Sequence, residues 1–109
     1  MAAPWAVVFL NDTVFGEMQD QPDDVRAIFV RISELVASYG LENVREPYMK
    51  HLQAKLWEMR LKGKDGIARA LYVTATGRRV VVLRVFTKKT QKTPNDEIKL
   101  ALKRAKEIE

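Results

Sequence analysis

Two arginines interrupt apolar strand patterns in this chain, and their type and position are what first suggest chemistry. Arg60 lies in the alternating residues 55–61, and Arg84 interrupts the nearly continuous apolar run 80–86. A charge among the apolar residues of a strand is costly unless it faces a cleft, a partner or a counter-ion. We therefore predict that Arg60 and Arg84 contact an anionic ligand. An ion pair with Glu58 or with the acidic N-terminal half is the alternative.

A polar stretch, residues 87–93, follows the second of these strands and carries three threonines and three lysines. The lysines are Lys88, Lys89 and Lys92. Because alternate residues of a strand point to the same face, we expect Arg84, Phe86 and Lys88 on one face. A strand that delivers cations and hydroxyls to one edge of a protein suits a polyanion. A solvated loop is the alternative for the lysines, and a core position is the alternative for Phe86.

Arg69, Tyr72 and Lys55 complete the set of candidates. Arg69 and Tyr72 lie on a predicted strand, residues 67–76, with opposite parity, so a regular strand turns them to opposite sides. A twist or bulge would relax that constraint. The one histidine, His51, is interpreted as structural or as a phosphate contact.

Signatures of metal, thiol and nucleotide-cofactor sites are absent from the sequence. The chain has no cysteine, and a single histidine cannot build a two-histidine metal site. Glu58 and Asp65 are isolated from other acids, so we expect no carboxylate cluster for magnesium. No H-E-x-x-H, Walker A or G-x-G-x-x-G motif occurs. We expect neither a metal nor another cofactor.

Charge is distributed unevenly along the 109 residues, whose formal net charge is +5 and whose pI is near 9.6. Residues 1–48 hold three basic and eight acidic side chains, whereas residues 49–109 hold sixteen and six. The second half therefore carries +10, which favours a nucleic acid or another polyanion as partner; a basic surface without such a partner is the alternative.

Hydropathy points to a single domain without a membrane segment. No apolar run approaches the ~20 residues of a membrane span, and the run 5–10 is too short for a signal peptide. We expect an intracellular, cytoplasmic protein that has no membrane partner.

Hydrophobic periodicity predicts the helices that must position these side chains. Residues 22–39 place apolar residues three and four apart, which is typical of an amphipathic helix, and Gly40 suits its end. A short helix is predicted over residues 13–18. A C-terminal helix is predicted to begin at Thr93 as N-cap, with Pro94 in its first position.

The strand pattern predicts a meander. Residues 5–10 read as a first strand, and residues 41–50 as a connection. Three strands, residues 55–61, 67–76 and 80–86, follow one another with short glycine-containing turns, which is typical of antiparallel pairing.

Three motifs together resemble the HigB-like branch of the RelE/ParE toxin superfamily. They are L-W-E-M-R at 56–60, R-A-L-Y at 69–72, and V-L-R-V-F-T-K-K-T-Q-K-T-P at 82–94 before an acidic helix start. The resemblance covers nearly the whole chain. It implies an α+β, RelE-like fold in one domain, residues 1–109. In that fold a small antiparallel sheet carries two N-terminal helices on one face, a C-terminal helix follows, and the other face is concave and basic.

The resemblance also implies a function: a type II toxin that cleaves mRNA on the translating ribosome without a metal. The implied partners are mRNA, the ribosome and a cognate helix-turn-helix antitoxin. The predicted catalytic residues are Arg60, Arg69, Tyr72, Arg84 and Lys88. The predicted RNA-binding residues are Lys55, Phe86, Lys89 and Lys92.

Cleavage through the 2′-hydroxyl needs a base, cations around the phosphorus and an acid for the leaving oxygen. Cations are plentiful here. The segment after Pro94 lacks the histidine or tyrosine that some relatives use in catalysis. Three candidates for the general base therefore remain: Tyr72, Glu58 and a lysine of lowered pKa. Two other functions are the alternatives. The protein could be a gyrase-directed toxin of the ParE type or a nucleic-acid-binding regulator without catalysis.

Overall fold

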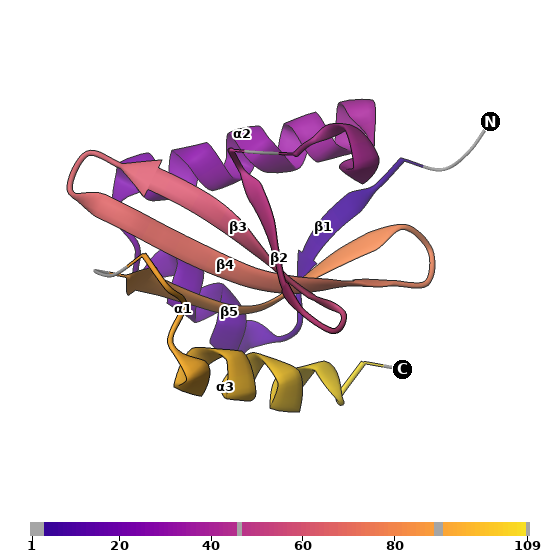
Figure 1. The fold of residues 1–109 in the computed structure, drawn as a ribbon. Coiled ribbons are helices and arrows are strands. Elements are labelled where there is room, and N and C mark those ends of the chain that lie inside the picture. Colours follow the sequence, from indigo (N-terminus) through magenta and orange to yellow (C-terminus); the bar gives the residue numbers. More distant parts are fainter. Residues whose placement is uncertain (1–3, 46, 89–90, 109) are drawn as a thin grey trace.

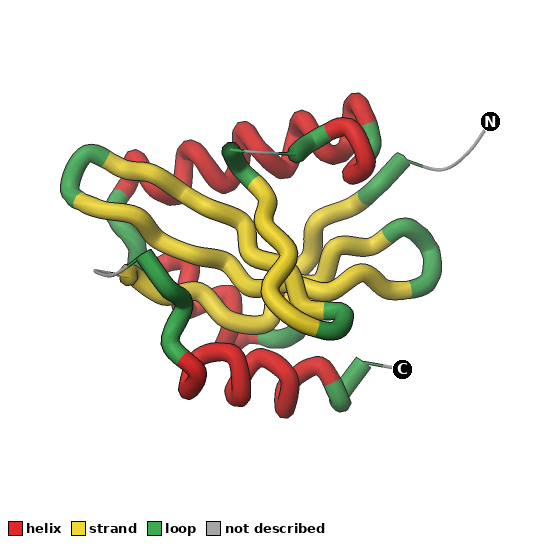
Figure 2. Tube along the Cα trace, in the orientation of Figure 1, coloured by secondary structure: helices red, strands yellow, loops and turns green. Residues whose placement is uncertain are grey.

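A mixed sheet separates two N-terminal helices from a C-terminal one (Figures 1 and 2). The computed structural model describes residues 4–45, 47–88 and 91–108, and within these ranges it has five strands and three α-helices. The strands are β1 (Ala6–Phe9), β2 (Met49–Gln53), β3 (Leu56–Gly63), β4 (Gly66–Ala75) and β5 (Arg79–Lys88). The helices are α1 (Asp12–Gln19), α2 (Asp23–Tyr39) and α3 (Asn95–Ala105), and a 3₁₀ turn, η1 (Leu41–Asn43), follows α2. The predicted α+β class is confirmed.

The sheet has the order β1-β5-β4-β3-β2, and its first strand departs from the expected antiparallel arrangement. β2, β3, β4 and β5 form an antiparallel meander, whereas β1 pairs with β5 in parallel. Two helices carry the chain away from β1, and it returns beside β1 only as the last strand. The predicted antiparallel pairing is confirmed for β3, β4 and β5, whereas the parallel pairing of β1 was not predicted, because contacts between distant segments leave no periodic pattern in the sequence.

Strand β2 begins in the last two residues of the predicted connection, 41–50, and continues to Gln53. It starts at Met49, which pairs with Met59 of β3. Its turn into β3 contains Ala54, whose φ of 50° lies in the left-handed region. Five residues with one buried apolar side chain give too short a pattern to predict a strand.

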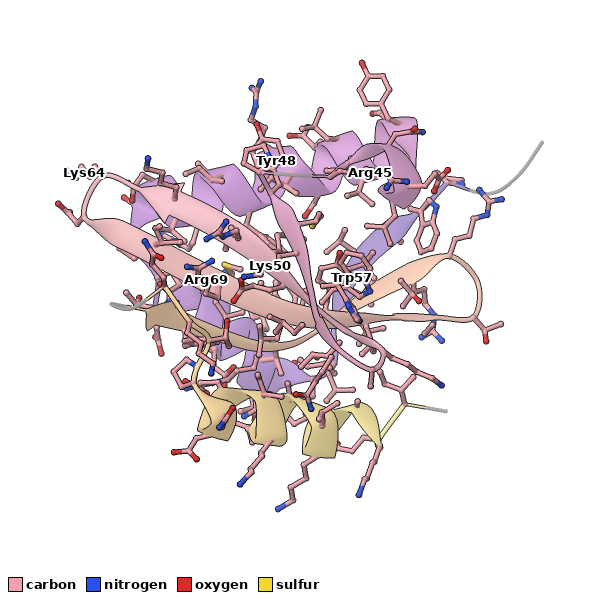
Figure 3. The ribbon with its side chains drawn as sticks, viewed as in Figure 1. Arg45, Tyr48, Lys50, Trp57, Lys64 and Arg69 are labelled. Carbon is pink, nitrogen blue, oxygen red and sulfur yellow. The ribbon has the colours of Figure 1, made fainter. Side chains whose placement is uncertain are left out.

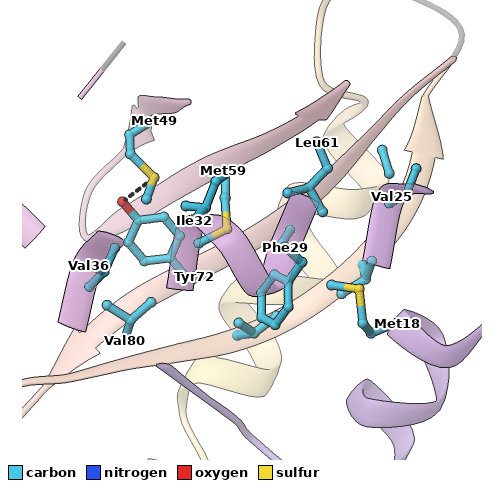
Figure 4. Packing of buried hydrophobic residues seen from close by; sticks show 14 of the residues in the cluster. Met18, Val25, Phe29, Ile32, Val36, Met49, Met59, Leu61, Tyr72 and Val80 are labelled. Atoms are coloured by element: carbon cyan, nitrogen blue, oxygen red, sulfur yellow. Dashed lines mark hydrogen bonds between the residues drawn. The ribbon is translucent and has the colours of Figure 1, made fainter. Parts of the chain in front are cut away.

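One face of the sheet packs against α1 and α2. The apolar stripe predicted for residues 22–39 is confirmed, because Val25, Phe29, Ile32 and Val36 of α2 are all buried in a core with the strands (Figure 4). α1 adds Val14 and Met18 to the same core. The two N-terminal helices thus share one face, as expected.

The opposite face, which was expected to be concave and basic, is partly covered by α3 and is apolar there. Ala101 of α3 is buried with Leu71, Val81 and Leu83 of the strands, so this half of the face is a second apolar core. Figure 1 shows α3 and α2 on opposite sides of the sheet. None of the described helices combines the length and the apolar character that crossing a membrane would require.

The start of α3 differs from its prediction. The helix begins at Asn95 with Pro94 before it, and no side chain caps its first turn. The Thr93 hydroxyl, which was expected to cap the helix, instead donates a hydrogen bond to a carboxylate oxygen of Glu58. A buried carboxylate is a stronger acceptor than solvent, and the exposed N–H groups of the first turn can bond to water.

Candidate nucleic-acid interface

The sheet face that carries α3 has an apolar half and a cationic half. Strand register sets Arg60 of β3 beside Arg69 of β4, and Arg69 beside Phe86 of β5. The next row toward the β3–β4 turn joins Lys62, Ile67 and Lys88. In the preceding row, Lys50 of β2 pairs with Glu58 of β3, and Leu71 pairs with Arg84. Figure 3 shows Lys50 and Arg69 over the middle of the sheet. The fold therefore brings most of the predicted catalytic cations onto one face.

A buried ion pair lies at the centre of this cationic half. Arg69 Nη1 is 3.1 Å from Glu58 Oε2, and the side chains are 2% and 1% exposed. Thr93 donates to the other carboxylate oxygen, which ties the end of the lysine-rich stretch to the sheet. Burial lowers the pKa of Arg69, the charge of Glu58 opposes this shift, and nearby Arg60 adds to it.

Burial changes the interpretation of both partners. Arg69 was predicted to be catalytic and Glu58 was one of the candidate bases, but neither side chain reaches solvent in this structure. Each neutralises the other, so Arg69 supplies little net charge to a ligand. We interpret the pair as structural: it fixes the positions of the residues that lie over it on this face of the sheet.

Arg60 differs from Arg69 in having no counter-ion among the residues that the structure describes. Its guanidinium is partly exposed, and it forms no ion pair or side-chain hydrogen bond with the residues that the structure describes. The expected alternative partner, Glu58, is occupied by Arg69. Lys50 and Lys62 are exposed on the same face. Lys50, Arg60 and Lys62 are called the cationic surface below.

Arg84 forms structural ion pairs with two acidic residues. Its Nε lies 2.8 Å from Glu97 of α3 and its Nη1 lies 3.0 Å from Glu17 of α1. Arg104 of α3 also pairs with Glu17, at 2.9 Å, and its Nη1 donates to the Leu83 carbonyl oxygen at 2.8 Å. The network joins α1, β5 and α3 along the sheet edge. The alternative of an ion pair with the acidic N-terminal half therefore describes Arg84 better than a ligand contact does.

The charges of this network shift one another's ionisation. Hydrogen bonds to Glu97 raise the pKa of Arg84 above its usual value, despite partial burial. Burial alone would raise the pKa of Glu17, but the hydrogen bond from Arg104, a backbone N–H of β5 and the charge of Arg84 hold it below the usual value. Both groups are thus stabilised in their charged forms.

A β-bulge in β5 determines where Arg84 points. Leu71 of β4 pairs with Arg84, but the next residue, Tyr72, pairs with Val82, so Leu83 is an extra residue. Strict alternation would have placed Arg84 on the face of Val82, which belongs to the α1–α2 core. The bulge moves Arg84 to the α3 face.

Phe86 is a core residue, which was the alternative to its predicted role in RNA binding. It is 7% exposed and packs in the apolar core under α3. The Arg84 guanidinium lies 5.8 Å from the centre of its ring, in the range of a cation–π contact. Arg84 and Phe86 share a face, as predicted. The ring of Phe86 is buried, however, so it cannot stack on a nucleotide base.

Tyr72 lies on the opposite face from the arginines, which removes it from the candidate site. It is 2% exposed in the α1–α2 core, and its hydroxyl lies 3.4 Å from the Met49 sulfur (Figure 4). Burial raises its pKa strongly, so it is a poor base at neutral pH. The opposite parity of Arg69 and Tyr72 was predicted correctly.

The predicted lysines occupy different ends of the sheet. Lys55 is exposed in the β2–β3 turn, at the end of β3 remote from Lys62. Lys88 ends β5 with its backbone paired to Ile67, while its side chain and the whole of Lys89 lie outside the described residues. Lys92 is exposed just before α3. The structure does not bring Lys55 to the cationic surface.

His51 has a structural environment. Its Nε2 lies 2.8 Å from the Ala54 carbonyl oxygen in the β2–β3 turn, and its ring lies 5.0 Å from that of Trp57. Among the described residues, no three His, Asp or Glu side chains gather as a metal site would need.

Sequence reasoning missed Lys50, Lys62 and Tyr48. Lys50 was hidden because strand β2 was not predicted, and Lys62 was assigned to a turn. Tyr48, 37% exposed, precedes β2, and its carbonyl oxygen accepts a 2.7 Å hydrogen bond from the Arg60 N–H. The even spacing of Glu58, Arg60 and Lys62 was the available signal for one common face.

Comparisons with known proteins give a family and a fold. The family described as phage-derived Gp49-like protein matches residues 16–106. No curated protein sequence matches the chain. The free state of a mutant E. coli toxin RelE is similar over 93% of this chain and 97% of its own, with 15% identity and a TM-score of 0.66. The archaeal RelE–RelB complex from Pyrococcus horikoshii OT3 is similar over 79% of this chain and 97% of that one, with 15% identity and a TM-score of 0.57.

Proposed function

Because the chain belongs to the phage-derived Gp49-like family and has the fold of RelE, we propose that it is a type II toxin. In this proposal it belongs to the HigB-like branch and cleaves mRNA on the translating ribosome without a metal ion. The observation that carries the proposal is the cationic surface. Three basic side chains without an ion-pair partner among the described residues lie on one sheet face, above a buried ion pair.

The cationic surface supplies the electrostatic part of the reaction. The 2′-hydroxyl loses its proton and attacks the adjacent phosphate, the P–O5′ bond breaks, and the leaving 5′-oxygen takes up a proton, which gives a 2′,3′-cyclic phosphate and a 5′-hydroxyl. Negative charge grows on the phosphoryl oxygens during this step, and a fixed cation there lowers the barrier. Arg60 is the candidate for this role because it has no ion-pair partner within the described ranges and its backbone is fixed in β3. Lys50 and Lys62 hold the phosphates on either side. RNA contacts are also proposed for Lys88, Lys89 and Lys92, which follow one another in the sequence at and after the end of β5.

Arg69 and Arg84 act in this proposal as positioning residues. Arg69 holds Glu58, which in turn holds Thr93 and the end of the lysine-rich stretch. Arg84 ties β5 to the two helices that flank it.

The proposal is tested by cleavage of a defined mRNA with purified protein, with and without translating ribosomes and in the presence of EDTA. We expect cuts with ribosomes, insensitivity to EDTA, and products that end in a 2′,3′-cyclic phosphate, the signature of attack by the 2′-hydroxyl. Inhibition of gyrase supercoiling without any RNA cleavage would instead identify a toxin of the ParE type. RNA binding with neither activity would identify a regulator.

We also propose a cognate helix-turn-helix antitoxin, with which this cytoplasmic protein forms a complex. The structural likeness to RelE in its complex with RelB supports a partner of this kind. Expression of the chain alone is expected to arrest growth, and co-expression of the neighbouring gene is expected to restore it. Full growth at a high level of folded protein would contradict this prediction.

A further inference from the structure

A groove runs between helix α2 and the end of β3, on the side of the sheet where β2 stops. Pairing of β2 with β3 ends where the Arg60 N–H meets the Tyr48 carbonyl oxygen, so beyond this point β3 no longer pairs with β2. The groove has a volume of about 450 Å³. Its lining residues are Ile28, Arg31, Ile32, Leu35, Pro47, Tyr48, Arg60, Lys62 and Ile67.

The groove combines an apolar floor with a cationic rim. Isoleucines and a leucine form its floor, and Arg31, Arg60 and Lys62 supply three positive charges. Among the residues that the structure describes, no acidic one lines it. Arg31 is exposed on α2, and no ion pair of its side chain occurs within the described ranges. This charge pattern fits an anionic ligand that also has an apolar part.

Tyr48 adds an aromatic face to the groove. Its side chain is 37% exposed although it lies between Pro47 and the paired residue Met49. Exposed aromatic rings beside cations are the usual platform on which proteins stack the bases of single-stranded nucleic acid. A base, unlike a lipid or a phosphate alone, would use the ring, the apolar floor and the cations together.

The groove is continuous with the cationic surface through Arg60 and Lys62, which belong to both. A strand of RNA whose reacting phosphate lies at Arg60 therefore has a neighbouring nucleotide within reach of the groove. A larger cavity, about 850 Å³, lies along β2 and η1. Its lining has two basic residues, Arg45 and Lys50, and the acidic Glu42, which sum to +1 against +3 for the described lining of the groove. Charge complementarity to RNA is thus greater in the smaller groove.

We propose that this groove is a second nucleotide-binding subsite for single-stranded RNA, in which Tyr48 stacks on one base and Arg31 and Lys62 bind the phosphates beside it. The proposal rests on the proposed function, because it takes RNA as the substrate. In this proposal the subsite selects the base at a position one nucleotide or more from the bond that is cut.

The test uses a fluorescent single-stranded RNA with 2′-O-methyl groups, which binds without being cut, and the same RNA with an abasic site at each position in turn. We expect Tyr48→Ala to weaken binding roughly 5- to 100-fold, the range for one lost base–aromatic stack. Tyr48→Phe should keep the parental affinity. Arg31→Ala should weaken binding about 3- to 10-fold by removing a phosphate contact. Lys103→Ala, which removes the same charge from an exposed position on α3, should have no effect.

The abasic series identifies the contact itself. One abasic position should weaken binding to the parental protein and have no further effect in Tyr48→Ala. If the parental protein binds the RNA but neither Tyr48→Ala nor Arg31→Ala weakens it, the subsite is disproved and the proposed function stands. If the groove variants bind weakly while the parental protein never cleaves RNA, the subsite stands and the enzymatic proposal fails. Variants that lose the antitoxin and keep RNA would show that the groove holds a protein, which also overturns the inference.

Discussion

Replacing Arg60 by alanine is expected to slow single-turnover RNA cleavage by roughly 10²-fold or more, the usual cost of losing one group that stabilises transition-state charge. Arg60 is the arginine of this face that is partly exposed and lacks a counter-ion among the described residues, whereas Arg69 and Arg84 are paired. RNA affinity should fall much less, because Lys50 and Lys62 remain. The measurement is the cleavage rate at saturating protein beside equilibrium binding to the uncleavable RNA.

Arg78→Ala is the matched control for this experiment. Arg78 is exposed in the β4–β5 turn, so its removal takes the same charge from the protein at a position remote from the cationic surface. It should leave the saturated rate unchanged. Cleavage by Arg60→Ala at the parental saturated rate, with an unchanged circular dichroism spectrum, would rule out the catalytic role.

Arg69→Met is expected to destabilise the folded protein by about 3–5 kcal/mol, because it leaves the Glu58 carboxylate buried without its charge partner. Both side chains are almost completely buried, so solvent cannot take the place of the missing partner. Urea unfolding followed by circular dichroism gives the free energy of unfolding. A loss below about 1 kcal/mol would show that water or a neighbouring group reaches the site.

The double variant Glu58→Met/Arg69→Met separates the charge effect from packing. Replacing both members of a buried pair by apolar residues of similar size is often neutral or stabilising. We therefore expect it to recover most of the stability that Arg69→Met loses. Thr93 loses its acceptor in this variant, so its cleavage rate reports how far the Glu58–Thr93 bond positions the lysine-rich stretch. A double variant as unstable as the single one would contradict the buried-pair interpretation.

Much of the fold follows from local patterns. Helix α2 is readable because its apolar residues recur at helical spacing, and β3, β4 and β5 because apolar runs alternate with glycine turns. The excess of cations in the second half is a property of composition alone. These features depend on residues that are close in the sequence, so no tertiary information is needed to find them.

The partner of each charge, in contrast, depends on residues that are distant in the sequence. Whether an arginine serves a ligand or an ion pair depends on which carboxylate lies beside it. The sequence could not show that Glu58 meets Arg69 or that Glu17 of α1 meets Arg84. In the part of the chain that the structure describes, Arg60 has no ion-pair partner, because Arg69 takes the carboxylate of Glu58 on the same strand.

By itself, then, the sequence determined the helices, the β3–β4–β5 part of the meander and the excess of positive charge in the second half, because spacing and composition are local. Only the tertiary structure decided that β1 joins β5 in parallel, that a bulge turns Arg84 toward α3, and that Tyr72 is buried on the other face. It also decided that Tyr48, Arg31 and Lys62 line one groove. The physical reason is that burial and ion pairing are set by contacts between distant segments, whose approach no periodicity records.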